Sequence, residues 1–141
     1  MILAIRIKGM VGNNRKIEDT FARLHLKRKY ACTIVREKPE ILGMIRKLEN
    51  CIAYGKIDKE LLKELVEKRG ELIDKTQKTD KIKMVEEFLT GRTEKSWRDL
   101  NIKPFFRLHP PRKGIKSKKH FPKGVLGNNK EKINELLRRM L

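Results

Sequence analysis

The side chains best able to do chemistry are two cysteines, Cys32 and Cys51, and two histidines, His109 and His120. A zinc site needs four ligands, commonly in pairs roughly two to five residues apart. Here 18 residues separate the cysteines and 10 separate the histidines. The histidines also lie in a strongly basic segment, which disfavours a second cation. We therefore predict no metal site, and we expect both cysteines to be small core residues in a reducing environment.

Other residue types found in catalytic sites are present, but not in catalytic patterns. The two serines, Ser96 and Ser117, lie in polar surroundings. The carboxylates cluster at 58–74, where they alternate with lysines as on a solvated helix face. The segments GMVG and PKGVLG lack the glycine spacing of phosphate-binding loops. We predict neither an enzyme nor a cofactor.

The net charge indicates the class of partner. The 141 residues include 36 Lys and Arg against 18 Asp and Glu, for a formal net charge of +18. This net charge is +8 over residues 1–57, zero over 58–100 and +10 over 101–141. A folded monomer with this charge repels itself, and a polyanionic partner would compensate the repulsion. We expect the contacts with that partner at the two ends of the chain.

The segment 106–124, FRLHPPRKGIKSKKHFPKG, holds seven basic residues and no acidic one. Its prolines stiffen the chain and its glycines allow sharp turns, which favours an ordered structure over a disordered tail. No helix-turn-helix, zinc-finger or basic-zipper pattern accompanies it. Irregular basic loops with a few stacking groups fit RNA better than DNA. Phe106, His109 and Phe121 are the candidates for stacking, although we expect Phe106 to be a core residue.

The elements that must position these residues begin with an alternation of strand and helix. Apolar periodicity predicts strands at 2–7, 31–36 and 51–57, with one helix at about 15–26 and another that starts at Pro39. Either asparagine just before the first helix can cap it. This β-α-β-α-β order favours two right-handed strand–helix–strand crossovers and a small sheet with both helices on one face.

The composition changes at residue 58, and we interpret 58–100 as a helical insertion. Asp58 can cap a helix that Gly70 is placed to end. A second helix is expected at about 80–89, because apolar residues recur there at helical spacing. Trp97 is expected to be the packing anchor of this insertion.

Residues 101–141 form the third part, a basic C-terminal extension. The segment IKPFFRL predicts a short strand. A final helix is expected at about 129–140, and Asn128 and Glu131 have the spacing of a capping box. Its apolar stripe is formed by Ile133, Leu136, Leu137 and Met140.

No targeting or membrane segment is evident from the sequence. No run approaches the ~20 apolar residues that a membrane-spanning helix needs. The first basic residue follows the apolar N-terminal run, whereas a signal peptide carries its charge before that run. We therefore expect a cytoplasmic protein without a membrane partner.

Several motifs together resemble a known family. FRLHPPRKG, followed by KGVLG and INELLRRM, resembles the C-terminal part of archaeal and eukaryotic members of the large-subunit ribosomal protein family that is numbered thirty in bacteria and seven in eukaryotes. MILAIRIKGMVG and VREKPEILGMIRKLE resemble the core shared with the short bacterial members. An insertion such as 58–100 is expected in the archaeal form. The resemblance implies an α+β, ferredoxin-like β-α-β-α-β core with a helical insertion and a basic C-terminal extension.

The resemblance also implies a function. A chain of this family is expected to be part of the 50S subunit, where it binds and stabilises large-subunit rRNA near the 5S rRNA and beside other ribosomal proteins, without catalysis. The basic and amide side chains of both ends would contact the rRNA. These are Lys8, Asn13, Asn14, Arg15, Lys16, Arg23, Lys27, Arg28, Arg46, Lys47, Arg107, His109, Arg112, Lys113, Lys116, Lys118, Lys119 and Lys123.

A second interpretation uses the same basic surface in a different class of protein. The chain would then be a free RNA-binding protein or a translational regulator. Co-migration with large subunits on a sucrose gradient after a high-salt wash distinguishes the ribosomal component from the free binder.

Overall fold

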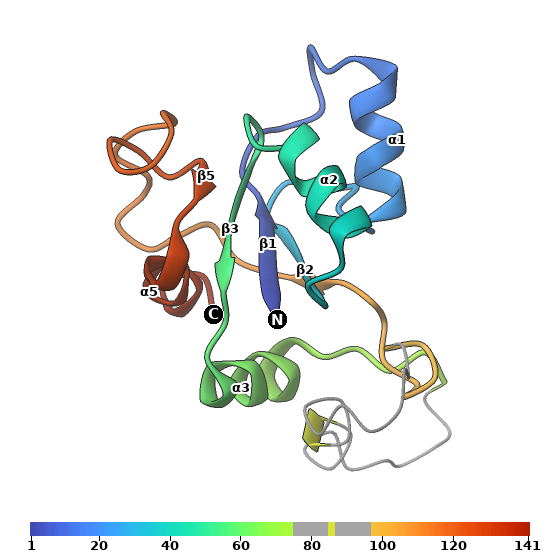
Figure 1. Ribbon diagram of the computed structural model, residues 1–141. Coiled ribbons are helices and arrows are strands. Elements are labelled where there is room, and N and C mark those ends of the chain that lie inside the picture. Colours follow the sequence, from blue (N-terminus) through green and yellow to red (C-terminus); the bar gives the residue numbers. More distant parts are fainter. Residues whose placement is uncertain (75–84, 87–96) are drawn as a thin grey trace.

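A computed structural model describes residues 1–74, 85–86 and 97–141 (Figure 1). The first part alternates β1 (Ile2–Arg6), α1 (Arg15–Arg23), β2 (Ala31–Val35), α2 (Pro39–Lys47) and β3 (Ile52–Lys56). Then come α3 (Lys59–Arg69), β4 (Phe106–Arg107), β5 (Gly127–Asn128), the 3-10 helix η1 (Lys130–Lys132) and α5 (Ile133–Arg138). This arrangement is an α+β fold consistent with the ferredoxin-like core that the sequence predicted.

The five strands form one sheet in the order β4-β2-β1-β3-β5. β1 is antiparallel to both β2 and β3, so β2 and β3 run parallel to each other on either side of it. The connection through α2 therefore crosses over β1, whereas the connection through α1 joins antiparallel neighbours. The expectation of two crossovers was wrong for the first connection, because strand order and direction are set by long-range pairing that local periodicity does not report.

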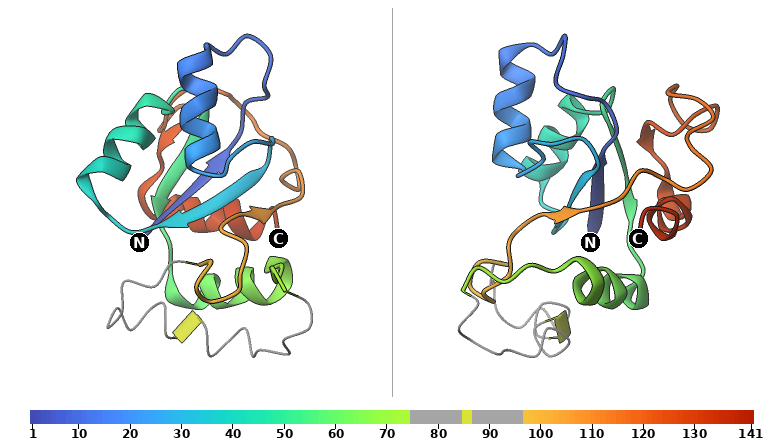
Figure 2. Two further views of the ribbon diagram at one scale, coloured as in Figure 1. Left: turned by 90° about the vertical axis from the view of Figure 1, so that its right-hand side faces the viewer. Right: turned by 180° about the vertical axis from the view of Figure 1, so that it is seen from behind.

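Helices cover both faces of the sheet. α1 and α2 lie together on one face, while α3 and α5 lie away from them (Figure 2). On this face, Phe21 of α1 and Ile45 of α2 join one hydrophobic cluster with residues of the sheet. On the opposite face Leu62 of α3 and Leu137 of α5 join one hydrophobic cluster with β1 and β2. All five residues of β1 are buried because the strand is central and covered on both sides.

Trp97 links the insertion to the sheet. Its side chain is buried and its Nε1–H donates to the Ile34 carbonyl oxygen at 3.0 Å. Its ring meets Phe106 edge to face, with the ring centroids 5.8 Å apart. The predictions that Trp97 is a packing anchor and that Phe106 is a core residue are both confirmed. The helix expected at about 80–89 lies outside the described residues except for residues 85–86.

The ends of the helices agree only in part with the sequence predictions. Asn14 caps α1, because its Oδ1 accepts from the Lys16 N–H at 3.3 Å. α1 ends at Arg23 rather than at about residue 26, and His25 then takes a φ of 58°. α2 begins at Pro39 as predicted, and α3 lies between Asp58 and Gly70, although the Asp58 side chain makes no capping hydrogen bond.

The final helix is shorter than predicted and begins as a 3-10 turn. Asn129 and Lys132, the residues that precede η1 and α5, make no side-chain capping hydrogen bond. The predicted capping box is not formed, because Asn128 Oδ1 accepts from the Lys130 N–H at 3.0 Å rather than from that of Glu131. Asn128 instead belongs to β5. The apolar stripe is confirmed, because all four of its residues are buried: Ile133, Leu136, Leu137 and Met140.

Candidate nucleic-acid interface

The buried side chain of Arg6 organises two loops at one end of the sheet. Its Nε donates to the Lys8 carbonyl at 3.0 Å, and Nη2 donates to the Gly9 carbonyl at 2.9 Å. Its Nη1 donates to the carbonyls of Leu26 and Lys27 at 2.9 and 3.2 Å. The loop after β1 and the loop after α1 are therefore fixed against each other by one guanidinium.

The Arg6 guanidinium also contacts α1. It lies 3.8 Å from the centroid of the Phe21 ring, and Nη2 is 3.0 Å from Glu18 Oε1. The pKa of Glu18 lies below its ordinary value, chiefly because the Asn13 amide donates a hydrogen bond to its carboxylate at 2.7 Å. The adjacent Arg6 guanidinium lowers this pKa further, whereas partial burial of the carboxylate raises it. Glu18 is therefore ionised at neutral pH and neutralises Arg6.

The two asparagines of this loop have internal roles. Asn13 Nδ2 donates to Glu18 and to the Gly9 carbonyl at 3.0 Å, so both hydrogens of this amide are used within the loop. Asn14 caps α1, as described above. The exposed cations of this region are left to face outward: Lys8, Arg15, Lys16, Arg23, Lys27 and Arg28.

The loop after β1, the turn between α2 and β3 and the segment before β5 extend from the same end of the sheet (Figure 1). Arg46 and Lys47, in the last turn of α2, are both exposed. The structure therefore brings the predicted residues of the first loop and of α2 to the same end as much of the basic C-terminal segment.

A pocket of about 220 Å³ joins the two basic ends of the chain. It is lined by Lys27 and Arg28 from the loop after α1 and by Arg107 from β4, together with Phe105 and His25. The pKa of His25 is lowered, mainly by burial and then by nearby positive charge, so its imidazole is mostly neutral at pH 7. The positive charge of this pocket therefore comes from its lysine and arginines.

The first half of the basic segment is anchored to the C-terminal helix. The His109 N–H donates to the Met140 carbonyl at 3.0 Å, and the Arg112 N–H donates to the Arg139 carbonyl at 2.9 Å. In return, Arg139 Nε donates to the Arg112 carbonyl at 3.0 Å, and its Nη2 reaches the carbonyls of Arg112 and Gly114. The backbone of the segment is thus fixed while its own side chains remain outside.

The second half folds back on itself beside β5. The Phe121 N–H donates to the Leu126 carbonyl at 2.8 Å, and the Leu126 N–H donates to the Lys119 carbonyl at 3.0 Å. His120 Nε2 lies 2.7 Å from Asn50 Oδ1 and so links the segment to the turn before β3. The remaining predicted residues of the segment are all exposed: Arg107, His109, Arg112, Lys113, Lys116, Lys118, Lys119 and Lys123.

Metal chemistry finds no support within this arrangement. In the part of the chain that the structure describes, no three His, Cys, Asp or Glu side chains are grouped as metal ligands. Cys32 and Cys51 are buried, unpaired with each other, and lie in the cores on opposite faces of the sheet. Burial raises the pKa of the Cys32 thiol, so it is not a thiolate at neutral pH.

The candidate interface and α3 differ in whether their cations form ion pairs. Among residues 1–74, 85–86 and 97–141, none of the predicted lysines and arginines pairs with a carboxylate. Three lysines on or near α3 pair with carboxylates: Lys63 with Glu86 at 2.8 Å, Lys68 with Glu64 at 2.6 Å and Lys103 with Glu71 at 2.7 Å. The unpaired cations are therefore concentrated where the sequence predicted a polyanion.

Comparison with known proteins decides the family. The family model for ribosomal protein L30p/L7e matches residues 2–52, from β1 to the start of β3. "Large ribosomal subunit protein uL30" of Archaeoglobus fulgidus is 39% identical to this chain, with 99% of each chain covered. The chain belongs to the ribosomal protein L30p/L7e family.

Two further relatives have the same name. The protein from Methanoculleus marisnigri is 39% identical over 99% of each chain, and that from Methanococcus vannielii is 37% identical over 97%. These L30p/L7e relatives extend the similarity through α3 and the basic segment, beyond the residues that the family model matches. As a member of a ribosomal protein family, the chain is a structural protein and not an enzyme, as predicted.

No described helix is long and apolar enough to cross a membrane.

Sequence reasoning about the L30p/L7e interface missed the residues whose internal contacts hold its loops in place. Arg6 was not predicted, although a charged residue inside the apolar run ILAIRI is a signal that it has internal partners. Lys132, whose Nζ lies 5.6 Å from the centroid of the Phe121 ring, and Arg139 were also missed, because their contacts are long-range.

Proposed function

We propose that this chain is a structural constituent of the large ribosomal subunit that binds and stabilises large-subunit rRNA near the 5S rRNA. Membership of the L30p/L7e family and the names of the archaeal relatives support the ribosomal role. The observation that carries rRNA binding is the concentration of exposed, unpaired lysines and arginines on loops whose backbones are fixed by internal hydrogen bonds. The position near the 5S rRNA rests on the family resemblance alone.

The mechanism is electrostatic and depends on spacing. Each lysine or arginine that neutralises a phosphate releases condensed counterions, which favours binding without reading a base. Guanidinium groups can donate two hydrogen bonds to one phosphate, and lysines reach further as point charges. The buried Arg6 and the half-buried Arg139 hold the loops that carry the cations, so less ordering is needed when RNA binds.

A salt titration tests this mechanism. The full chain is mixed with protein-free large-subunit rRNA from the source organism, and the Kd is measured between 50 and 200 mM monovalent salt. If at least six phosphates are neutralised, the affinity falls by roughly a thousandfold over this range. An affinity that is independent of salt contradicts the proposal. The ribosomal role is tested separately, because recovery of the chain only in soluble fractions of a sucrose gradient indicates a free RNA-binding protein.

A further inference from the structure

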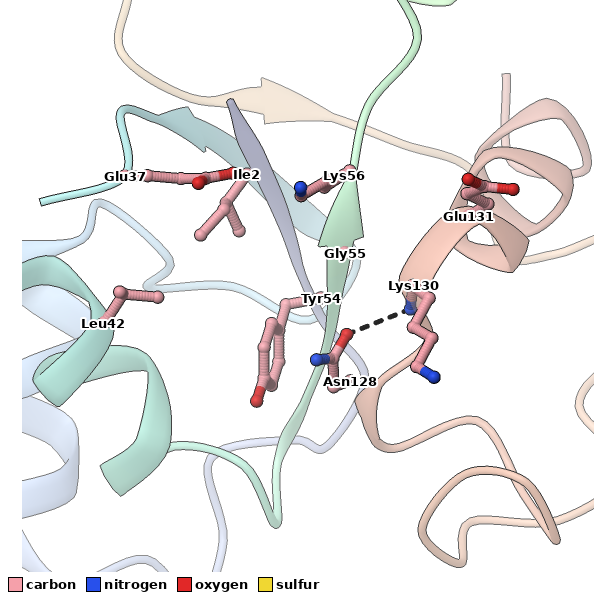
Figure 3. A pocket seen from close by; sticks show the side chains of 9 residues that line it. All are labelled: Ile2, Glu37, Leu42, Tyr54, Gly55, Lys56, Asn128, Lys130 and Glu131. Carbon is pink, nitrogen blue, oxygen red and sulfur yellow. Dashed lines mark hydrogen bonds between the residues drawn. The ribbon is translucent and has the colours of Figure 1, made fainter.

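A pocket of about 430 Å³ lies on the α2 side of β3, at the edge where β5 is added (Figure 3). Its walls include Tyr54 of β3, Asn128 of β5, Leu42 of α2 and two lysines, Lys56 and Lys130. None of these five was predicted as an RNA contact. We propose that this pocket binds one unstacked nucleotide of the rRNA, a site that rests on the function proposed above.

Tyr54 supplies the stacking surface. It packs against the core beneath α2 and is only half-buried. Its partner across the parallel β3–β5 pair is Asn128, and paired residues on neighbouring strands point to the same face. Figure 3 shows the ring and the amide facing the same space. The site thus combines an aromatic face with a polar group beside it.

The amide of Asn128 is oriented for donation. Its Oδ1 accepts from the Lys130 N–H at 3.0 Å, which fixes the side chain and leaves Nδ2 on the pocket side (Figure 3). Within the described part of the chain, neither this Nδ2 nor the Tyr54 hydroxyl has a hydrogen-bond partner. Both groups can therefore donate to the ring nitrogens and carbonyl oxygens on the edge of a nucleobase.

The backbone keeps the pocket preformed. Gly55 lies directly beneath η1, where an added Cβ would collide with the Lys130 carbonyl oxygen and with Ile133. This close approach allows the segment that carries Asn128 to lie against β3. Because the wall is built on paired strands rather than on a free loop, little ordering is needed when a ligand binds.

The charges around the pocket suit a nucleotide and connect it to the wider interface. Lys56 and Lys130 are exposed and can reach the phosphates on either side of a bound base. Two carboxylates also line the pocket. Glu37 lies 3.8 Å from the N-terminal amine, which offsets its charge, and Glu131 is exposed in η1, so the two lysines and the amine outnumber the carboxylates. Burial and then the charge of Glu49 raise the pKa of Tyr54, and the charge of Arg46, a predicted rRNA contact, opposes this rise.

A nucleotide is a better fit than a phosphate alone or a peptide. Besides its two lysines, the pocket offers an aromatic ring and an amide. Single-stranded RNA is typically recognised by splayed bases that stack on aromatic side chains and form hydrogen bonds along their edges. The volume is within the range of about 300–1,000 Å³ that is usual for small-ligand sites.

The test compares Tyr54→Leu, Tyr54→Phe and Asn128→Ala in the full chain, with protein-free large-subunit rRNA of the source organism as the probe. Loss of a stacked base raises the Kd about 5- to 100-fold in Tyr54→Leu, whereas Tyr54→Phe, which keeps the ring, stays close to wild type. Because a stacked base carries no charge, Tyr54→Leu leaves the slope of log K against log salt unchanged. Lys130→Ala reduces this slope by about 0.7, and the control Lys63→Ala, whose lysine on α3 is paired with Glu86, does not.

A second measurement does not depend on affinity. Short-wavelength ultraviolet irradiation of the complex, followed by cleavage after lysine, is expected to leave a nucleotide on peptide 48–56, which contains Tyr54. Circular dichroism and thermal melting confirm that each variant is folded.

Each outcome either supports or overturns the site. Unchanged Kd values for Tyr54→Leu and Asn128→Ala, with wild-type chain still bound, overturn the site and leave the proposed function intact. Failure of the wild-type chain to bind rRNA overturns both. If Tyr54→Leu binds rRNA normally but no longer sediments with large subunits, the pocket takes a neighbouring protein, and the nucleotide proposal is wrong.

Discussion

The guanidinium of Arg6 is fully buried, yet each of its three nitrogen atoms has an acceptor. Four of the acceptors are carbonyls from two loops, and one is the carboxylate of Glu18. A buried charge is tolerated when its hydrogen-bonding capacity is met in this way. A single side chain in the central strand therefore sets the positions of loops that carry several of the predicted rRNA contacts.

Replacing Arg6 with lysine is expected to be strongly destabilising although the charge is kept. A single ammonium cannot reach acceptors spread around a planar fork, so buried carbonyls lose their partners. We expect the free energy of unfolding in urea to fall by about 2–4 kcal/mol. The matched control, Arg138→Lys on the exposed face of α5, should change it by less than about 0.5 kcal/mol. Equal effects of the two substitutions would contradict the role assigned to Arg6.

At the scale of elements, β3 and η1 meet without space for a side chain. Gly55 is buried between them, and its backbone faces the Lys130 carbonyl. β5, only two residues long, is added to the sheet beside this contact. The packing of the C-terminal extension on the core therefore depends on a residue of the N-terminal part.

Gly55→Ala is expected to force η1 away from β3. Overpacking of this kind costs about 1–3 kcal/mol, measurable as a lower urea midpoint. Gly43 provides a matched control, because it is exposed in α2 and an added Cβ there meets no atom within 4 Å. Gly43→Ala should stabilise the chain by about 0.5–1 kcal/mol through helix propensity. A Gly55→Ala variant as stable as wild type would show that η1 can shift away from β3 without a loss of stability.

Local patterns predicted most of the elements, and long-range contacts explain the rest. Strands and helices through Gly70 were found because apolar spacing, Pro39 and the asparagines before α1 are local signals. The early end of α1 at a left-handed His25 has no such signal, since the residue is not glycine. Likewise β5 exists only because β3 lies beside it, and the Tyr54 pocket exists only because β5 does. Charge predicted the class of the candidate surface, but not the internal residues that shape it.

At the scale of the whole molecule, the basic side chains fall into two groups, those paired with a carboxylate and those that are not. Lys63, Lys68 and Lys103, on or near α3, are paired with carboxylates, whereas the lysines and arginines predicted to contact rRNA have no carboxylate partner among the described residues. Exposed ion pairs contribute little to stability, so pairing mainly determines which cations are available to phosphates. RNA binding should therefore be sensitive to the location of a lysine rather than to net charge alone.

Two double variants with the same change of charge test whether RNA binding depends on the location of the lysines or on net charge alone. Lys118→Ala with Lys119→Ala should reduce the slope of log K against log salt by roughly 1–2, because up to two phosphate contacts are lost. Lys63→Ala with Lys68→Ala removes two paired lysines and should leave the slope unchanged. Filter binding to large-subunit rRNA measures both. Equal slopes for the two variants would mean that affinity follows net charge alone.

The anchoring of the basic segment has a consequence for the timing of its folding. His109 and Arg112 donate their main-chain N–H groups to carbonyls of residues 139–140. A chain is synthesised from its N-terminus, so these carbonyls are made after the strands and helices of the first part. The loops that Arg6 holds can reach their final form while synthesis continues, but residues 109–114 must wait. The partners of Arg6 all lie within residues 8–27, so the hydrogen bonds that fix the N-terminal basic loops can form before those that fix the C-terminal segment.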